Sequence, residues 1–324
     1  MNPLANRPLR IGALSPDTLP LRYFEEFSNH RLAVGGIVHE WSFGETQIAE
    51  PDIVILLAHG RDNSVALQTL RQRFPDAFLA AWLWDNHLAP DNNVRTVENS
   101  DAFFISHAFQ EALRYFGSLL PRCIGHVPSC CGQWSCATIS SEFENSIGQT
   151  RSDALHAAYV DYPWSQRSPF LRRLALEVRN CDARLMDPAH RERYFGLSKT
   201  DQVREWCFYK TSVVIPVSAD LSTRLFDALA CGQLPIVSDV VMDLDRVISP
   251  DIQRSLPILK FRAGDFQSLR TMHAEAIRRF DEGGARAARG RHRYAMENHT
   301  LENRVASIVT TITSLSGLRA VAVT

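Results

Sequence analysis

Apolar runs of four to eight residues alternate with amphipathic stretches along the N-terminal third of the chain, and the runs contain few polar positions. Such runs predict parallel strands that are buried on both faces of a sheet. The predicted strands are 9–14, 52–58, 77–84 and 102–105, and the predicted helices are 63–74 and 107–116, with Ser106 as the cap of the second helix. Strands that alternate with helices of this length are typical of a doubly wound parallel sheet.

The alternation stops over residues 135–153, which are rich in Ser, Thr, Glu and Asn, and it resumes afterwards. The polar stretch predicts a linker between domains. Beyond it we predict strands at 156–160, 183–186, 212–217, 235–237 and 258–261 and helices at 169–179, 199–209, 266–280 and 301–315, with a further helix of about eight residues that ends before Gly232. Because 324 residues are too many for one ordinary α/β core, we expect domains over 1–150 and 151–300 and a closing segment over 301–324.

Composition narrows the class of protein. The chain is 45% hydrophobic and 22% charged, as in soluble enzymes, and its formal net charge of -1 argues against nucleic-acid binding along the whole chain. No apolar run reaches the length of a membrane span, and the first residues lack the order of a signal peptide. Three of the seven cysteines, Cys130, Cys131 and Cys136, lie close together without a second pair at zinc spacing. We therefore expect free thiols, no metal and a cytoplasmic location.

The stretch "STRLFDALACGQLPIVSD" combines several local signals between two predicted strands. Ser222 or Thr223 can cap a short helix, and Gly232 can end it in the left-handed conformation. The helix N-terminus then lies at the carboxyl edge of the sheet, where free N–H groups and the Arg224 charge suit a phosphate. The carboxylate of Asp227 can accept two ribose hydroxyls. The alternative is an ion pair of Asp227 with Arg224 on a solvated helix face.

This stretch resembles the "R-x-F-E-A-L-A-C-G" signature of GT-B glycosyltransferases related to the retaining enzymes with an E-x7-E pattern. The segment "ENHTLENRVASIV" resembles the "H-T-x-x-x-R-x-x-x-I" helix that closes many such chains, and "YVDYPWSQRSPFLRRL" resembles the start of their C-terminal domain. "WLWDNH" and "SDAFFISHAFQEALRYFG" resemble their N-terminal domain. The resemblance implies an α/β fold of two Rossmann-like, doubly wound domains that face a cleft, with a C-terminal helix that crosses back to the N-terminal domain.

The resemblance also implies roles for particular residues. Asp227 takes the place of the second glutamate of E-x7-E, which holds the ribose. Ser222, Thr223 and Arg224 become neighbours of the diphosphate, and Arg167 matches a basic residue that stabilises the leaving phosphates. A surface charge at a helix start is the alternative for Arg167. The first glutamate falls on Ala219, with Asp220 as the nearest acid, so the choice between retention and inversion stays open.

GT-B enzymes meet the charge of the leaving diphosphate with helix N-termini and basic side chains instead of a metal. "DLD" at 243–245 imitates a metal-binding motif of another fold, and we assign it no metal. His59, Asp85 and His87 follow predicted strands and are candidates for the general base, with turn and capping roles as their alternative. Trp82, Trp84 and Trp164 either line a sugar pocket or belong to the core.

The sequence thus predicts a hexosyltransferase-like enzyme that moves a sugar from a nucleoside diphosphate, UDP or GDP, to a hydroxyl of a glycan, a lipid-linked intermediate or a protein. It needs no cofactor beyond that co-substrate. A nucleotide-sugar epimerase of the same fold and a non-catalytic nucleotide- or sugar-binding protein are the alternatives. A dehydrogenase ranks last, because "RIGALSPD" lacks a G-x-G-x-x-G pattern. Peripheral membrane contact and the oligomeric state are left open.

Overall fold

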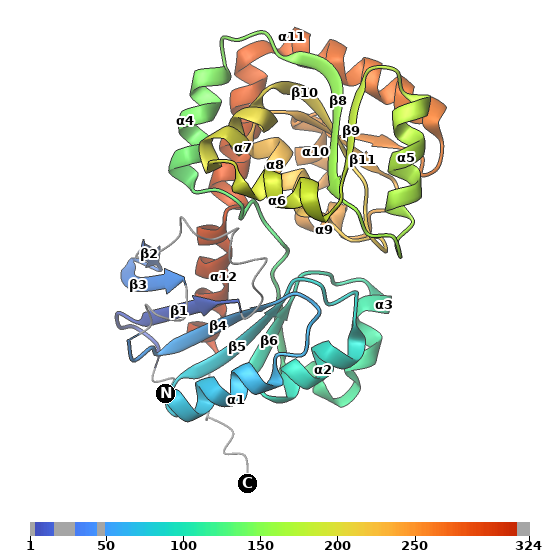
Figure 1. Ribbon diagram of the computed structural model, residues 1–324. Coiled ribbons are helices and arrows are strands. Elements are labelled where there is room, and N and C mark those ends of the chain that lie inside the picture. The colour runs from blue at the N-terminus through green and yellow to red at the C-terminus, as the bar shows by residue number, and fades with distance from the viewer. Residues whose placement is uncertain (1–3, 16–29, 44–48, 316–324) are drawn as a thin grey trace. The chain divides into compact units, whose positions relative to one another are not determined.

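The computed structural model describes residues 4–15, 30–43 and 49–315. They form two compact units, each with its own sheet (Figure 1). Unit 1 comprises the described parts of Met1–Ser129 and Leu301–Thr324, and unit 2 is Cys130–Thr300. The closing helix, α12 (Leu301–Ser314), therefore packs with the N-terminal unit.

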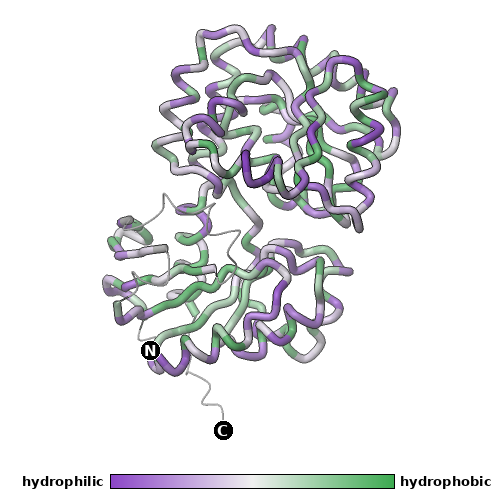
Figure 2. Tube along the Cα trace, in the orientation of Figure 1, coloured by the Kyte–Doolittle hydropathy of each residue, from purple (hydrophilic) through white to green (hydrophobic). Residues whose placement is uncertain are grey.

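Unit 1 contains a seven-stranded sheet of order β2-β3-β1-β4-β5-β6-β7. Neighbouring strands are parallel except β2 and β3, which form an antiparallel edge pair. The strands are β1 (Arg10–Leu14), β2 (His30–Val34), β3 (Ile37–Phe43), β4 (Ile53–Ala58), β5 (Phe78–Leu83), β6 (Ala102–Ile105) and β7 (Cys123–His126). Every residue of β4, β5 and β6 is buried, as the apolar runs predict, and these strands are green in Figure 2.

The helices of unit 1 cover this sheet. They are α1 (Ser64–Arg73), α2 (Pro90–Glu98), α3 (Gln110–Leu113), a 3₁₀ helix over Arg114–Arg122, and α12. Helix α12 contacts both β2 and β7, the two edge strands. Its buried residues include Leu301, Val305, Ile308 and Ile312, at the spacing of one helix face.

The predicted helix over 107–116 is confirmed only from Gln110 onward, and its predicted cap is wrong. Helix α3 begins only at Gln110, and the Ser106 hydroxyl donates to the carbonyl of Val127 instead of capping a helix. The reason is Asn86, whose amide oxygen accepts from the backbone N–H groups of Ser106 and His107 and holds them in a loop. The sequence also gave no sign of β2, β3, α2 or β7.

Unit 2 contains a five-stranded, entirely parallel sheet of order β12-β11-β10-β8-β9. Its strands are β8 (Ser152–Val160), β9 (Cys181–Met186), β10 (Tyr209–Val214), β11 (Leu234–Ser238) and β12 (Leu259–Phe261). Its helices are α4 (Cys136–Ser146), α5 (Arg167–Glu177), α6 (Pro188–Gly196), α7 (Lys199–Cys207), α8 (Thr223–Ala230), α9 (Leu244–Val247), α10 (Pro250–Ser255) and α11 (Phe266–Asn298).

Helix α8 is buried over most of its length, since every residue from Leu225 to Ala230 is buried. Its cap signals are confirmed. The Ser222 side chain accepts from the N–H of Arg224, and Gly232 has a φ of +69° just past the helix. A Cβ atom at Gly232 would lie 2.4 Å from the ring of Phe143, so the position requires glycine for space as well as for conformation.

Two expectations about unit 2 are corrected. Residues 136–146 of the predicted linker form helix α4, which packs against α7. Its buried side chains Ile139, Phe143 and Ser146 recur at helical spacing, but too few of them are apolar to reveal the period. The predicted helix over 266–280 is the first part of the longer α11: Gly284 breaks α11 with a φ of +54°, and a second helical stretch continues to Asn298.

Candidate functional site

The order of strands in unit 2 reverses between β8 and β10. From β8 the chain adds β9 on one side, and it then returns to add β10, β11 and β12 on the other side. Ligands of open α/β sheets bind outside the carboxyl ends of the strands at such a reversal. Tyr159 ties the two strands together there, because its hydroxyl donates to Val213 O (2.6 Å) and accepts from Ile215 N (3.0 Å).

Two arginines lie over the ring of Tyr159. The guanidinium carbon of Arg167, at the start of α5, is 4.8 Å from the ring centroid, and that of Arg224, in the first turn of α8, is 5.5 Å away. Arg167 is only 7% exposed, so it is not the surface charge of the alternative interpretation. Burial lowers the pKa of Arg167, and the Arg224 charge lowers it further.

The guanidinium of Arg167 is poorly compensated within the described part of the chain. It donates one long hydrogen bond to Val160 O (3.4 Å), its Nε has no hydrogen-bond partner, and no carboxylate there lies within 4.0 Å of it. Asp220 acts on it only at longer range, where it raises the pKa of Arg167. A buried cation with an unused donor at a ligand-binding edge is suited to an anion.

The N-terminus of α8 adds positive potential to the same edge. Ser222, which is buried, precedes the helix, and Thr223, which is half-buried, begins it beside Arg224. The loop before α8 is strained: Ser218 and Ala219 have φ values of +50° and +68°, which non-glycine residues rarely adopt. Asp220 accepts from the N–H of Val217 and holds this loop, and Ala219 offers no carboxylate at the position of the family's first glutamate.

Asp227 is completely buried, at 0% exposure, so the alternative of an ion pair on a solvated helix face is wrong. Its Oδ2 accepts from Nε2 of Gln133 (2.6 Å), and Oδ1 has no hydrogen-bond partner in the described part of the chain. Burial raises the pKa of Asp227 to about 6, against the opposing effects of Arg224, Cys131 and Gln133. No local pattern in the sequence pointed to Gln133, which occupies one oxygen of this carboxylate.

Four histidines follow the carboxyl ends of four neighbouring strands in unit 1. His59 follows β4, His87 follows β5, His107 follows β6 and His126 ends β7. Nδ1 of His59 lies 3.8 Å from Oδ2 of Asp85, so two of the predicted residues are neighbours. Burial and the Arg61 charge lower the pKa of His59 to about 3. The ring is therefore neutral near pH 7.

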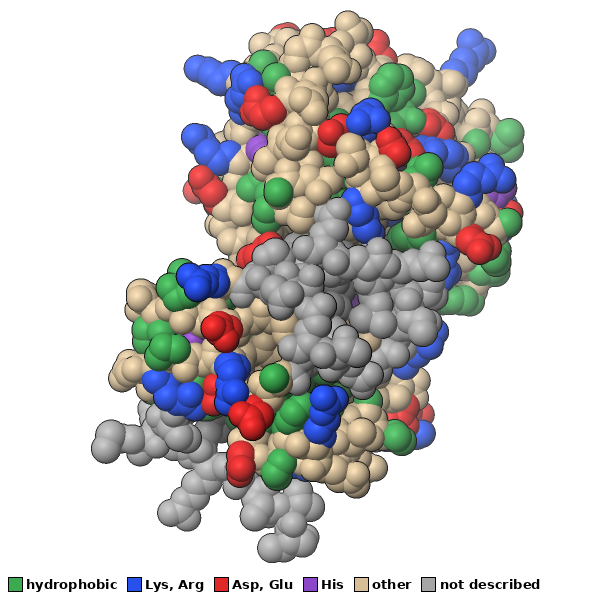
Figure 3. All heavy atoms as spheres, turned by 60° about the vertical axis from the view of Figure 1, so that its left-hand side comes forward, with side chains coloured by type: hydrophobic (Ala, Val, Ile, Leu, Met, Phe, Trp, Pro, Cys, Tyr) green, Lys and Arg blue, Asp and Glu red, His purple; other side chains and the backbone are tan. Residues whose placement is uncertain are grey.

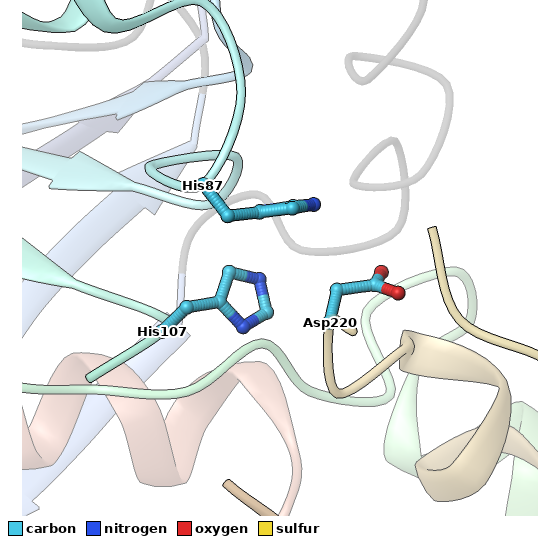
Figure 4. Close-up of side chains that lie close together, drawn as sticks. All are labelled: His87, His107 and Asp220. Carbon is cyan, nitrogen blue, oxygen red and sulfur yellow. The ribbon is translucent and has the colours of Figure 1, made fainter. Parts of the chain in front are cut away.

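His87, the third predicted base, lies against His107, with ring centroids 4.3 Å apart (Figure 4). Burial lowers the pKa of His107 well below its usual range, and the neighbouring charges of His87 and His126 add to this effect. His107 was not among the predicted site residues, because its place beside His87 depends on the pairing of β5 and β6. Asp220, also drawn in Figure 4, belongs to unit 2.

Several other sequence candidates have structural roles. Trp82 and Trp84 belong to the core of unit 1, whereas Trp164 in unit 2 is 62% exposed. The two acids of "DLD" bond to side chains: Asp243 pairs with Arg246 (3.4 Å), and Asp245 accepts from Lys260 (3.0 Å) and from Gln253 (2.8 Å). The seven cysteines are all free thiols.

Acidic and basic side chains are interspersed on the face that Figure 3 shows, in keeping with a net charge near zero. Within residues 4–15, 30–43 and 49–315, no helix combines the length and apolar character that crossing a membrane requires.

Comparison with solved structures identifies the fold. The chain resembles the catalytic domain of starch synthase IV from Arabidopsis thaliana, solved with ADP and acarbose, at 9% identity (TM-score 0.55; 94% of this chain and 99% of that chain). A glycosyltransferase from Rickettsia africae is similar at 8% identity (TM-score 0.53; 96% and 100%), and apo OtsA at 9% (TM-score 0.50; 97% and 100%).

This chain has the GT-B fold. Its two Rossmann-like units agree with the fold class that the sequence predicts. No family model matches the chain, and no curated protein matches it in sequence. The activity must therefore be argued from the site.

Proposed function

We propose that this GT-B protein is a glycosyltransferase that moves a sugar from a nucleoside diphosphate to a hydroxyl acceptor. The observation that carries the proposal is the pair of arginines over Tyr159, at the reversal of strand order in unit 2. Arg167 is buried there without a carboxylate in ion-pair contact, so the folded protein bears the cost of a cation that a diphosphate would neutralise.

The same groups supply the chemistry of transfer. When the bond between the sugar and the diphosphate breaks, negative charge develops on the leaving oxygen. Arg167, Arg224 and the N–H groups that begin α8 are fixed in place before the reaction, so they stabilise that charge with little reorganisation. Removal of one such donor typically costs about a hundred- to a thousandfold in rate. We propose that Ser222 and Thr223 contact the diphosphate and that the reaction needs no metal.

Asp227 is the proposed ribose ligand. Its carboxylate lies one turn into α8 from Arg224, and it becomes available when Gln133 moves aside. An ionised carboxylate can accept hydrogen bonds from both ribose hydroxyls, and the pKa of Asp227, about 6, allows ionisation at neutral pH. UDP and GDP are the proposed nucleotides of the donor.

The proposed general base for the acceptor hydroxyl comes from His59, Asp85 and His87 of unit 1. All three follow the carboxyl ends of β4 and β5, and the pKa of His59, about 3, makes its ring a weak proton acceptor at neutral pH. The proposed acceptors are glycans, lipid-linked intermediates and proteins, in the cytoplasm.

The test is the release of nucleoside diphosphate from a panel of UDP-, GDP- and ADP-sugars, without and with simple sugar acceptors. We expect slow release from one donor, and Arg167→Gln should reduce it about a hundredfold. The matched control is Arg173→Gln, which removes an exposed arginine from the same helix and should change the rate less than twofold. Nucleotide binding with no release from any donor would favour the non-catalytic binding protein, a role with which Ala219 is consistent.

A further inference from the structure

The site of unit 2 contains a continuous column of two arginines and four aromatic rings. Arg224 lies between Trp206 (5.1 Å) and Tyr159 (5.5 Å). Arg167 lies between Tyr159 (4.8 Å) and Tyr162 (4.9 Å), and Tyr162 stacks on Trp164 with centroids 5.5 Å apart and planes at 25°. Each contact is within the range of a cation–π or stacking interaction. The column thus runs from Trp206 through both arginines to Trp164.

The two ends of the column differ in accessibility. Trp206 is fully buried, whereas Trp164 is 62% exposed. Trp164 comes from the loop between β8 and α5, at the carboxyl edge of the sheet. An indole that stacks on a neighbour and still exposes most of its surface contributes little to the core. Its open surface is available to a ligand that already occupies the arginines.

The column gives the bound nucleotide a direction. This step rests on the proposed function. Asp227, the proposed ribose ligand, is completely buried one turn beyond Arg224 on α8 and bonds to Gln133. A nucleotide sugar has the order base, ribose, two phosphates, sugar. With the ribose next to Arg224, the phosphate farther from it lies at Arg167, and the sugar follows at Tyr162 and Trp164.

We propose that Trp164 is the platform on which the transferred sugar of the donor stacks, and that it determines specificity for that sugar. The faces of an indole are electron-rich, and they attract the C–H groups on one side of a pyranose ring. Tyr162, held by Arg167, keeps Trp164 in register with the phosphates. The nucleobase is at the other end of the donor and makes no contact with Trp164.

The test compares each nucleoside diphosphate with its own nucleotide sugar. Binding of UDP, GDP and ADP and of UDP-glucose, GDP-mannose and ADP-glucose is measured by calorimetry on the full chain and on Trp164→Ala and Trp164→Phe. Trp164 is exposed, so neither variant should unfold. We expect Trp164→Ala to weaken binding of the nucleotide sugar about three- to tenfold and binding of the nucleoside diphosphate less than twofold. Trp164→Phe should keep most of the affinity for the sugar nucleotide.

If Trp164→Ala weakens binding of both ligands equally, Trp164 contacts the nucleobase and the proposal is overturned. Unchanged affinity for both ligands would overturn it as well. These results are distinct from failure of the proposed function, in which the unmodified chain binds none of the six ligands. Loss of binding in Arg167→Gln, with Trp164→Ala as expected, would support both.

Discussion

At the scale of single residues, the site is a set of buried polar groups that the protein itself satisfies only in part. Asp227 has one carboxylate oxygen bonded to Gln133 and one without a partner, and Arg167 has an unused Nε. Such groups cost stability in the ligand-free protein. Under the proposed function these groups bind hydroxyls and phosphates. Local sequence patterns identified the residue types, but the burial of Arg167 and Asp227 depends on tertiary packing that such patterns do not describe.

Asp227 should make stability depend on pH. Its pKa is about 6 in the folded protein and about 4 in the unfolded chain, so the folded protein holds the proton more strongly. The contribution is fully present below pH 4 and is lost as pH rises through 6, by about 3 kcal/mol. Urea unfolding between pH 4 and 8 should show that Asp227→Asn removes this fall. The other titratable groups are the same in the unmodified chain and in Asp227→Asn. Identical pH profiles of the two proteins would therefore contradict the raised pKa of Asp227.

At the scale of elements, local signals predicted α8 well and α4 badly. The Ser222 hydroxyl caps the start of α8, and Gly232 follows its end in the left-handed conformation, so both signals lie within one turn of the helix. Helix α4 carries serine, threonine and glutamate on most positions, and it is a helix because Ile139 and Phe143 pack into a core formed by distant elements. Period and capping can predict the first kind of element. They cannot predict the second, whose stability comes from tertiary packing.

Replacement of Gly232 tests the C-terminal end of α8. Gly232→Ala imposes a left-handed alanine and drives a methyl group into Phe143, so we expect a loss of about 2–4 kcal/mol. Gly264→Ala is the matched control, because Gly264 has a φ of +77° but nothing within 4 Å of an added Cβ, and it should lose only about 1 kcal/mol. Urea denaturation measures both. Equal losses would mean that Phe143 yields and that packing does not fix the end of α8.

At the scale of the whole molecule, the apolar runs correctly predicted the doubly wound sheets, because buried parallel strands are continuous apolar runs, and the resemblance to GT-B glycosyltransferases correctly predicted the GT-B fold. It could not predict contacts between distant segments. Gln133 bonds to Asp227 across 94 positions of the chain, and Trp134 bonds to Gln202. Both residues come from the segment before β8, which local composition assigned to the end of the first domain and to a linker.

This difference can be measured on two fragments. Residues 130–300 contain the whole of unit 2, so we expect this fragment to fold cooperatively and to bind nucleotide as the full chain does. Residues 151–300 lack Gln133, Trp134 and Phe143, and so leave Asp227 unbonded and part of the α7 and α8 core exposed. Circular dichroism during heating should show a cooperative transition for the longer fragment only. A stable 151–300 fragment would place the boundary where the sequence suggested.

The central claim is that Arg167 and Arg224 bind the diphosphate of a nucleotide in unit 2. The most direct measurement is a thermal-shift panel of UDP, GDP, ADP, CMP and dTDP on the unmodified chain and on Arg167→Gln. A nucleotide at a hundred times its Kd adds about 2.7 kcal/mol of stability. We predict a raised Tm for one nucleoside diphosphate and its loss in Arg167→Gln. No shift with any nucleotide, or the same shift in the variant, would contradict the account.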